Sequence, residues 1–176
     1  EYVRVVIGLG GRNAGSADTV GPEAEWRRRS MTGPPPGPPL SAGVSRTMRR
    51  VRRKDTKPEL VLRRELHRRG LRFRVDFAGV PGRPDIALTK AKIAVFVDGC
   101  FWHGCPIHAT YPKNNEEWWG RKLRRNRERD REVNRRLGEH GWIVLRYWTH
   151  DDVDEIADEV EDVWRDVSGL PPLNRE

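Results

Sequence analysis

The sequence predicts an α/β domain in which a central β-sheet is flanked by helices. Segments with the 3.6-residue apolar period of amphipathic helices alternate with short runs rich in β-branched and aromatic residues, in the order α-β-β-β-α-β-α. One short run, IAVFV at 93–97, is apolar throughout, as is typical of a strand buried on both faces of a sheet. Such an order is typical of layered folds in which helices cover a sheet.

Proline and glycine divide the chain into unequal parts. Residues 1–43 contain GLGGRNAG and TGPPPGPPLSAG, which interrupt any regular period, so we expect a flexible leader that is disordered or not native to the protein. Residues 44–168 hold all the regular patterns and predict one compact domain of roughly 125 residues. Residues 169–176 are expected to form a C-terminal tail.

The first half of this domain is predicted to contain one helix and three strands. In DTKPELVLRRELHRRG, Asp55 or Thr56 can cap a helix that Gly70 ends. LRFRV at 71–75 alternates apolar and basic residues, which predicts a half-buried strand. DIALTKAKIAVFVD at 85–98 predicts two strands joined by a turn.

The second half is predicted to contain a basic helix, a strand and an acidic helix. Residues 115–138 carry apolar side chains at helical spacing in an arginine-rich segment. GWIVLRYW at 141–148 predicts a strand. Residues 152–167 place valine, isoleucine and tryptophan on one stripe with acids opposite, as in a helix that packs on a core.

Charge is separated along the chain. Thirty-four Lys and Arg against 26 Asp and Glu give a formal net charge of +8. From 121 to 136 there are nine basic and three acidic residues, whereas from 151 to 166 there are nine acidic residues and one basic residue. We therefore expect one cationic face that suits a polyanionic partner, with a merely solvated face as the alternative.

Membrane and export signals are missing from the sequence. No apolar stretch approaches the roughly 20 residues that cross a bilayer, and the chain does not start with the residue order of a signal peptide. We expect no membrane partner and a cytoplasmic protein. There, two cysteines five positions apart are expected to be reduced thiols or metal ligands rather than a disulfide.

Three side chains near the paired strands suit metal-dependent hydrolysis. Asp85 starts one predicted strand and Asp98 ends the next, so a hairpin brings their carboxylates side by side, where they can share Mg²⁺. His103 follows five residues later and can take a proton from an attacking water. Phosphodiester cleavage needs such an arrangement. Solvated turn aspartates and a structural histidine are the alternatives.

A second group of residues suits a structural zinc site. Cys100, Cys105 and His108 have the spacing Cys-x4-Cys-x2-His, and thiolates and imidazoles are the ligands that tetrahedral zinc prefers. His150 can be the fourth ligand if the strand before it lies beside IAVFV. Zinc binding would stabilise a loop that has little regular structure. Ordinary loop thiols are the alternative.

Four aromatic side chains accompany the basic segment. Phe101 and Trp102 lie between the predicted zinc ligands, and Trp118 and Trp119 open the basic helix. Rings beside a cationic surface can stack on bases or wedge between base pairs, whereas core packing is the alternative, above all for Trp119. The basic helix is expected to bind phosphates in a salt-dependent manner.

Together these motifs resemble the very short patch repair endonucleases, bacterial enzymes that nick DNA beside a T:G mismatch. The resemblance runs from about Ser45 to His150 and rests on SRTMRRVRRKDTKPE, PGRPDI, VFVDGCFWHGC, RRNRERDRE and GWIVLRYW, in that order. It implies a restriction-endonuclease-like fold with a central mixed sheet and a structural zinc site. It also implies a Mg²⁺-dependent DNA endonuclease of the bacterial cytoplasm, associated with the nucleoid, that acts where 5-methylcytosine has deaminated. We expect a monomer, because nicking one strand needs only one active site.

The resemblance also assigns roles to individual residues. Asp85 matches the family's Mg²⁺-binding aspartate, His103 its catalytic histidine, and Glu59 an acid that organises metal-bound water. Asp98 stands where the best-known member has a histidine, and we expect it to be a second metal contact. The implied Zn²⁺ ligands are Cys100, Cys105, His108 and His150. The residues expected to contact DNA are Phe101, Trp102, Trp119, Lys122, Arg125, Asn126 and Arg129.

Two other functions fit the same motifs. A structure-specific DNA nickase of the same fold would use the same residues on another DNA target. A zinc-stabilised DNA-binding module would bind zinc and DNA but would show no Mg²⁺-dependent cleavage.

Overall fold

The computed structural model describes residues 54–109 and 115–173. In these residues four strands form one sheet in the order β1-β2-β3-β4. β1 and β2 are antiparallel, as are β2 and β3, whereas β3 and β4 are parallel. The predicted mixed sheet with flanking helices is therefore confirmed, whereas the closer likeness to restriction endonucleases stays a prediction. The strands are β1 (Arg74–Val75), β2 (Ile86–Leu88), β3 (Ile93–Asp98) and β4 (Ile143–Trp148).

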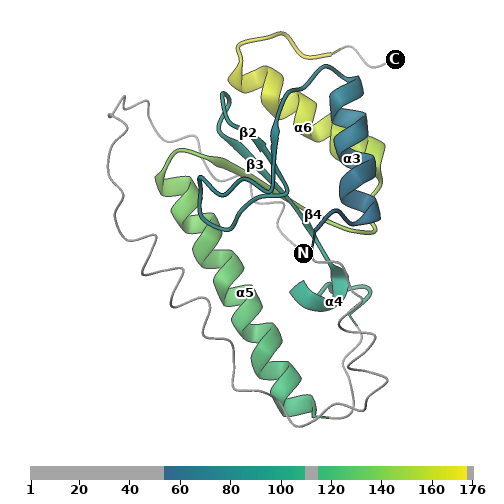
Figure 1. Ribbon diagram of the computed structural model, residues 1–176, viewed down its shortest axis with the longest axis vertical. Helices are drawn as coiled ribbons and strands as arrows, with labels where there is room; N and C mark the ends of the chain where they lie inside the picture. Colours follow the sequence, from purple (N-terminus) through teal and green to yellow (C-terminus); the bar gives the residue numbers. More distant parts are fainter. Residues whose placement is uncertain (1–53, 110–114, 174–176) are drawn as a thin grey trace.

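Helices cover both faces of this sheet (Figure 1). α3 (Lys57–Arg68) and α6 (Val153–Val167) lie side by side on one face. Leu62 and Leu66 of α3 and Ile156 and Val160 of α6 form one hydrophobic cluster there with Ile86 and Val95 of the sheet. α5 (Glu116–Glu139) packs on the other face through Val133 and Leu137, which meet Ala94 and Phe96. Successive residues of β3 thus alternate between two hydrophobic clusters, as expected for a strand with both faces buried.

The parallel pairing of β3 and β4 positions the ends of both strands. Ile93 pairs with Ile143, and Asp98 pairs with Trp148, so the two strands leave the sheet at the same edge. Thr149 continues the contact, since its backbone N–H donates to the carbonyl of Asp98 over 3.1 Å. Residues that follow the two strands are therefore neighbours, although about 50 positions separate them in the sequence.

The predicted strand at 71–75 is shorter in the structure. Only Arg74 and Val75 pair with β2, and both side chains are exposed rather than half-buried. Leu71 is buried, but its backbone N–H donates to the carbonyl of Leu66 at the end of α3. The helix terminus thus takes the hydrogen bond that a longer strand would need.

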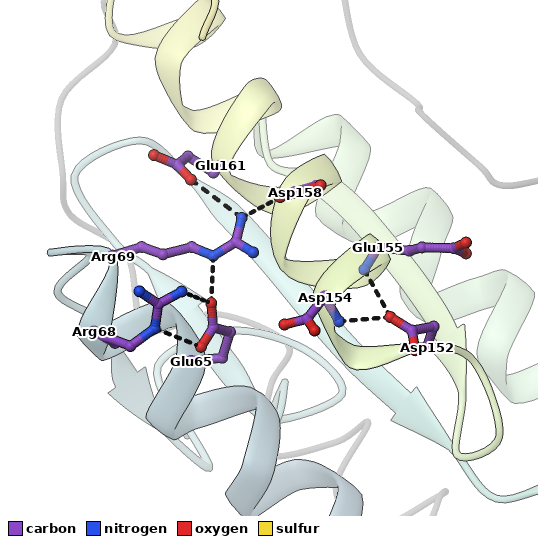
Figure 2. A network of polar contacts seen from close by, with 8 residues as sticks. All are labelled: Glu65, Arg68, Arg69, Asp152, Asp154, Glu155, Asp158 and Glu161. Atoms are coloured by element: carbon purple, nitrogen blue, oxygen red, sulfur yellow. Dashed lines mark hydrogen bonds and ion pairs between the residues drawn. The ribbon is translucent and has the colours of Figure 1, made fainter. Parts of the chain in front are cut away.

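A polar network fastens α3 to α6 (Figure 2). The guanidinium of Arg69, just beyond α3, donates to Glu65, to Asp158 and, over 3.3 Å, to Glu161. The start of α6 is capped by Asp152, whose carboxylate accepts from two backbone N–H groups of the first turn. The acidic face of α6 is thereby partly neutralised by a basic side chain next to α3.

The predicted domain limits fall partly outside the described residues. The leader at 1–43 lies wholly outside them, and so do residues 174–176 of the tail. α6 ends at Val167, and Gly169 follows with a positive φ of 68°. The limits of the domain and of the tail stay predictions. Among the residues that the structure describes, no helix is long and apolar enough to cross a membrane.

Candidate active site and metal cluster

A single-turn helix, α4 (Cys100–His103), connects β3 to the site residues. The sequence patterns did not predict it, because four residues are too few to show a period. Gly99 precedes the turn and Gly104 ends it in the left-handed conformation, with a φ of 69°. Successive side chains of a helix point roughly 100° apart. Consecutive residues of α4 can therefore face different neighbours.

His103 faces α5. Its Nδ1 atom lies 2.7 Å from Oδ2 of Asp130 and 3.4 Å from Oδ1 of Asp98. An ionised carboxylate only accepts hydrogen bonds, so Nδ1 carries the proton and, in the neutral ring, Nε2 is left as the acceptor. Nε2 is therefore the atom that can take a proton from water.

The charges around His103 favour a strong base. Burial lowers the pKa of His103, but the hydrogen bond to Asp130 and the charges of Asp98 and Asp130 outweigh it, so the pKa is raised. For Asp130, burial raises the pKa, but the bond to His103 and the charge of Arg146 hold it below its usual value. The pair is thus arranged as a base and an ionised acceptor that orients it.

Sequence reasoning missed both Asp130 and Arg146. Asp130 stands in the middle of the basic segment RRNRERDRE, where it resembles an ordinary surface acid. Arg146 is the charged residue within the apolar strand IVLRYW, and a charge in a buried strand is a signal for a paired polar site. In the structure the side chain of Arg146 is 7% exposed, and it contacts both Asp98 and Asp130.

Asp85 lies directly before β2 and reaches toward β3. Its Oδ2 atom accepts a hydrogen bond of 2.8 Å from the backbone N–H of Val97. Burial raises the pKa of Asp85 to about 6, the bond from Val97 opposes this, and the charges of Glu59 and Asp98 raise it further. A buried carboxylate near two other acids is stabilised by a cation, which suits a divalent metal ion.

Glu59 is held rigidly at the start of α3. It is 3% exposed, and its carboxylate accepts from the hydroxyl of Thr56, the backbone N–H of Asp55 and the guanidinium of Arg63. The contact with the hydroxyl of Thr56 ties Glu59 to the residue that precedes the helix. The helix start therefore places a fixed carboxylate within electrostatic range of Asp85.

Asp98 has partners that the sequence did not predict. Both of its oxygens accept from Nη1 of Arg146, at 2.9 and 2.7 Å, on the face of the sheet that α5 covers. Its carboxylate is thus already neutralised by a buried cation. Joint coordination of Mg²⁺ by Asp85 and Asp98 stays a prediction.

The four predicted zinc ligands come together beside α4. One ligand atom from each of Cys100, Cys105, His108 and His150 lies within 4.8 Å of the other three. Sγ of Cys100 is 3.0 Å from Nδ1 of His150. The ring centroids of His108 and His150 are 4.3 Å apart. The parallel strands bring His150 to Cys100, as predicted.

The donor set of this cluster fits zinc. Two thiols and two imidazoles can supply a closed tetrahedral site, in which ligand atoms lie roughly 3.5 Å apart. His150 is also held from its far side, where Nε2 lies 3.4 Å from the carboxylate of Asp151, as is common for metal-bound histidines. The gathering of the four side chains is a finding, whereas the identity of the metal stays a prediction.

The aromatic residues form one cluster between α4 and α5. Phe101 lies edge-on to both Trp102 and Trp119, with ring centroids 5.0 and 5.2 Å apart. Nζ of Lys122 lies 4.9 to 5.5 Å from the ring centroids of Trp102, Trp118 and Trp119. Trp119 is 3% exposed, so it would have to leave this cluster to enter DNA. Its contact with DNA stays a prediction.

The remaining predicted DNA contacts share one side of α5. Arg125, Asn126 and Arg129 follow Lys122 by three, four and seven positions, which places all four residues on one helical face. Arg125 and Arg129 are exposed, whereas Asn126 donates a hydrogen bond of 2.9 Å to the carbonyl of Trp102. This face therefore combines exposed arginine side chains with a link to α4.

Known DNA endonucleases are similar to this chain in sequence. A family model described as DNA mismatch endonuclease Vsr matches residues 41–108. The type II nicking enzyme V.NaeI of Lentzea aerocolonigenes is 50% identical over 129 residues, which are 70% of this chain and 78% of that protein. The type II nicking enzyme V.NmeDIP of Neisseria meningitidis serogroup C is 43% identical over 66% of this chain and 82% of that protein. The DNA mismatch endonuclease Vsr of Escherichia coli (strain K12) is 41% identical over 59% of this chain and 67% of that protein.

Proposed function

The chain belongs to the DNA mismatch endonuclease Vsr family and is an endonuclease that acts on DNA, and from that premise we propose that it nicks one strand beside the T of a T:G mismatch. The mismatch would arise where 5-methylcytosine has deaminated to thymine, so the nick would start very short patch repair. One active site suffices for one cut. A monomer in the bacterial cytoplasm, bound to the nucleoid, is therefore the proposed working form.

The observation that carries this proposal is the content of α4. Within one helical turn it holds a candidate zinc ligand, Cys100, two aromatic rings, Phe101 and Trp102, and the candidate base, His103. A helical turn is rigid, so the rings and the base keep a fixed spacing. Entry of the rings into the duplex would then set which phosphate lies at His103.

Mismatch discrimination would come from the cost of opening the duplex. A T:G pair unstacks at lower cost than a Watson–Crick pair, and insertion of Phe101, Trp102 and Trp119 would convert that difference into binding energy. Arg125 and Arg129, with Lys122 and Asn126, would meanwhile hold the phosphates. Sequence-independent charge contacts and a deformable mismatch together select the site.

The proposed chemistry needs Mg²⁺ at Asp85. When bound, this ion lowers the pKa of a water molecule and stabilises charge on the phosphate. Asp85 would hold the ion, and Glu59, fixed by Arg63, would orient the water molecules around it. His103 would accept the proton of the attacking water at Nε2, while Asp130 keeps the ring in the required tautomer.

The cluster of Cys100, Cys105, His108 and His150 is proposed as a structural Zn²⁺ site. All four positions of a tetrahedron are supplied by the protein, so no open position is left for catalysis. Zinc would join the residues after β3 to those after β4 and would hold α4 in place.

Strand-specific cleavage tests the proposal. We expect a duplex labelled on each strand to be nicked only on the T strand, only with a T:G pair, and with Mg²⁺ but not with EDTA. Asp85→Asn should abolish the nick. The matched control, Asp166→Asn, removes an exposed carboxylate at the end of α6 and should cut like the wild type.

Two outcomes would favour other functions. Several relatives are named type II nicking enzymes, so cutting of matched duplexes, or of another distorted site, would assign a nickase of the same fold with a different DNA target. Binding of the mismatched duplex without any nick, unchanged by Asp85→Asn, would assign a zinc-stabilised DNA-binding module.

A further inference from the structure

We infer that Arg146 is a positioning residue of this active site, which holds the carboxylates of Asp98 and Asp130 so that together they fix the ring of His103. The inference deepens the proposed function, because the role of His103 as a base rests on it. All four side chains, those of Asp98, His103, Asp130 and Arg146, belong to residues that the structure describes.

Arg146 is placed by the fold at a point where three elements meet. It lies on β4, and its side chain points to the face of the sheet that α5 covers, where its guanidinium stacks 4.3 Å from the ring centroid of Phe96 on β3. Nε donates a hydrogen bond of 2.9 Å to Oδ1 of Asn134 on α5. These contacts with Phe96 and Asn134 fix the plane of the guanidinium independently of the carboxylates.

The outer nitrogens of Arg146 reach both carboxylates. Nη1 lies 2.7 and 2.9 Å from the two oxygens of Asp98, and Nη2 lies 3.6 Å from Oδ1 of Asp130. Asp130 uses its other oxygen, Oδ2, for His103. Each carboxylate therefore lies near both Arg146 and His103. Asp130 uses a different oxygen for each, whereas Oδ1 of Asp98 lies near both.

This geometry needs a cation with the shape of arginine. Two buried carboxylates beside one imidazole repel each other, and without a counter-charge they would separate or rotate away from the ring. A guanidinium offers donors on two edges in one plane, so it can neutralise both acids while one oxygen of each faces His103. A lysine ammonium, as a point charge, can approach one acid well but has no second edge for the other.

A purely structural ion pair is the alternative role for Arg146. In that case the side chain only fastens α5 to the sheet, and its replacement would lower stability without changing the state of His103. The two roles differ in the proton position on the imidazole. A positioning role predicts that Nδ1 alone is protonated at a pH where the ring is neutral, and that this preference depends on Arg146.

The test compares Arg146→Lys and Arg146→Met with the wild type in three measurements. These are the single-turnover nicking rate at saturating T:G duplex, the Kd for that duplex, and the ¹⁵N–¹H NMR pattern of His103, assigned by loss of its signals in His103→Gln. We expect both variants to lose nicking rate on the order of 100-fold, with Kd changed by about two-fold or less. We also expect the pattern of a single Nδ1–H tautomer to give way to a mixture.

Further variants serve as controls. Arg135→Met removes an exposed arginine of α5 that pairs only with Glu132 and Glu139 among the described residues, and should leave the rate and the NMR pattern unchanged. Arg146→Lys combined with Asp130→Asn should lose little more rate than either change alone, because both act through His103. Arg146→Lys keeps a buried positive charge, so it serves if Arg146→Met does not fold.

A wild-type rate together with a wild-type tautomer in Arg146→Lys would overturn the inference. A lowered melting temperature with the tautomer retained would assign the structural role instead. If the wild-type protein nicks no duplex, the proposed function fails. The NMR pattern of the free protein still decides whether Arg146 positions the ring of His103.

Discussion

Nδ1 of His103 and Oδ2 of Asp130 lie 2.7 Å apart, although the two residues belong to different helices and are 27 positions apart in the sequence. The contact joins α4, the turn that follows β3, to the middle of α5. It fixes the proton on Nδ1 and leaves Nε2 for chemistry, so Asp130 can control the reaction rate through the ring of His103.

Asp130→Asn should therefore reduce the single-turnover nicking rate by roughly 100- to 10,000-fold, because an amide can donate to the ring and favour the wrong tautomer. The Kd for mismatched DNA should change little. The matched control is Glu128→Gln, an exposed acid two positions away on the same helix, which should keep the wild-type rate. Equal rates in Asp130→Asn and the wild type would exclude the proposed pairing.

The ionised carboxylate of Asp85 should lower the free energy of unfolding of the metal-free protein at pH values above the folded-state pKa of Asp85. Burial raises this pKa to about 6 from the ordinary 3.8, so the folded state binds the proton more tightly than the unfolded state does. The penalty is absent below about pH 4, grows between pH 4 and 6, and is complete above pH 6. In EDTA at pH 8, Asp85→Asn should raise the free energy of unfolding by roughly 2 kcal/mol.

Urea unfolding of Asp85→Asn and the wild type at pH 8 and at pH 4 checks this expectation. The difference between the two proteins should become small at pH 4, because Asp85 is then protonated in the folded state and only about half ionised in the unfolded state. A variant less stable than the wild type at pH 8 would mean that the buried carboxylate is compensated in a way that the contacts of Asp85 do not provide.

Arg69 should contribute more to stability than its neighbour Arg68. Arg69 is 13% exposed and bridges Glu65 on α3 to Asp158 and Glu161 on α6, whereas Arg68 is 71% exposed and pairs with Glu65 alone (Figure 2). Breaking a partly buried network leaves acids without a partner, whereas a surface pair contributes about 0–1 kcal/mol. Arg69→Met should therefore lower the free energy of unfolding at pH 7 by roughly 2 kcal/mol, and Arg68→Met should lower it much less.

The same network predicts an acid-sensitive step. Hydrogen bonds from Arg68 and Arg69 lower the pKa of Glu65 to about 2 from 4.5. A lowered pKa in the folded state gives stability that is present above pH 4.5 and is lost as the pH falls toward 2. The difference between Arg69→Met and the wild type should thus shrink between pH 4.5 and 2. A constant difference over that range, measured by urea unfolding, would show that Arg69 acts through packing rather than charge.

Local patterns predicted most of the fold. The helix at 115–138 and the strands around 93–97 and 141–148 agree with α5, β3 and β4, because long apolar periods and continuous β-branched runs survive tertiary packing. The strand predicted at 71–75 is longer than the observed β1, because the backbone N–H of Leu71 donates to the end of α3 instead of to a neighbouring strand. Such competition for one hydrogen bond leaves no trace in an apolar pattern.

The site was predictable only where its residues are close in the sequence or joined by paired strands. The proximity of Cys100 and His150 could be predicted, because the ends of adjacent parallel strands lie together. Asp130 and Arg146 were missed, since the packing angle of α5 on the sheet decides which of its many charged residues reaches His103. The pairing of Asp98 with Arg146 was missed as well, because Arg146 cannot be identified as its partner until β3 and β4 are aligned. Metal binding by Asp98 stays a prediction.

Removal of one candidate zinc ligand should uncouple α4 from β4. Cys100→Ser is expected to lower the bound zinc, measured by elemental analysis, and the melting temperature together, because a missing thiolate opens the tetrahedron and frees the turn that carries His103. Nicking should fall in the same preparation. Ile107→Ser, a change at a 74% exposed position of the same loop, is the control and should keep the zinc content and the melting temperature. Equal zinc in Cys100→Ser and the wild type would remove Cys100 from the ligands, and His150, 3.0 Å away, would then need another reason to face it.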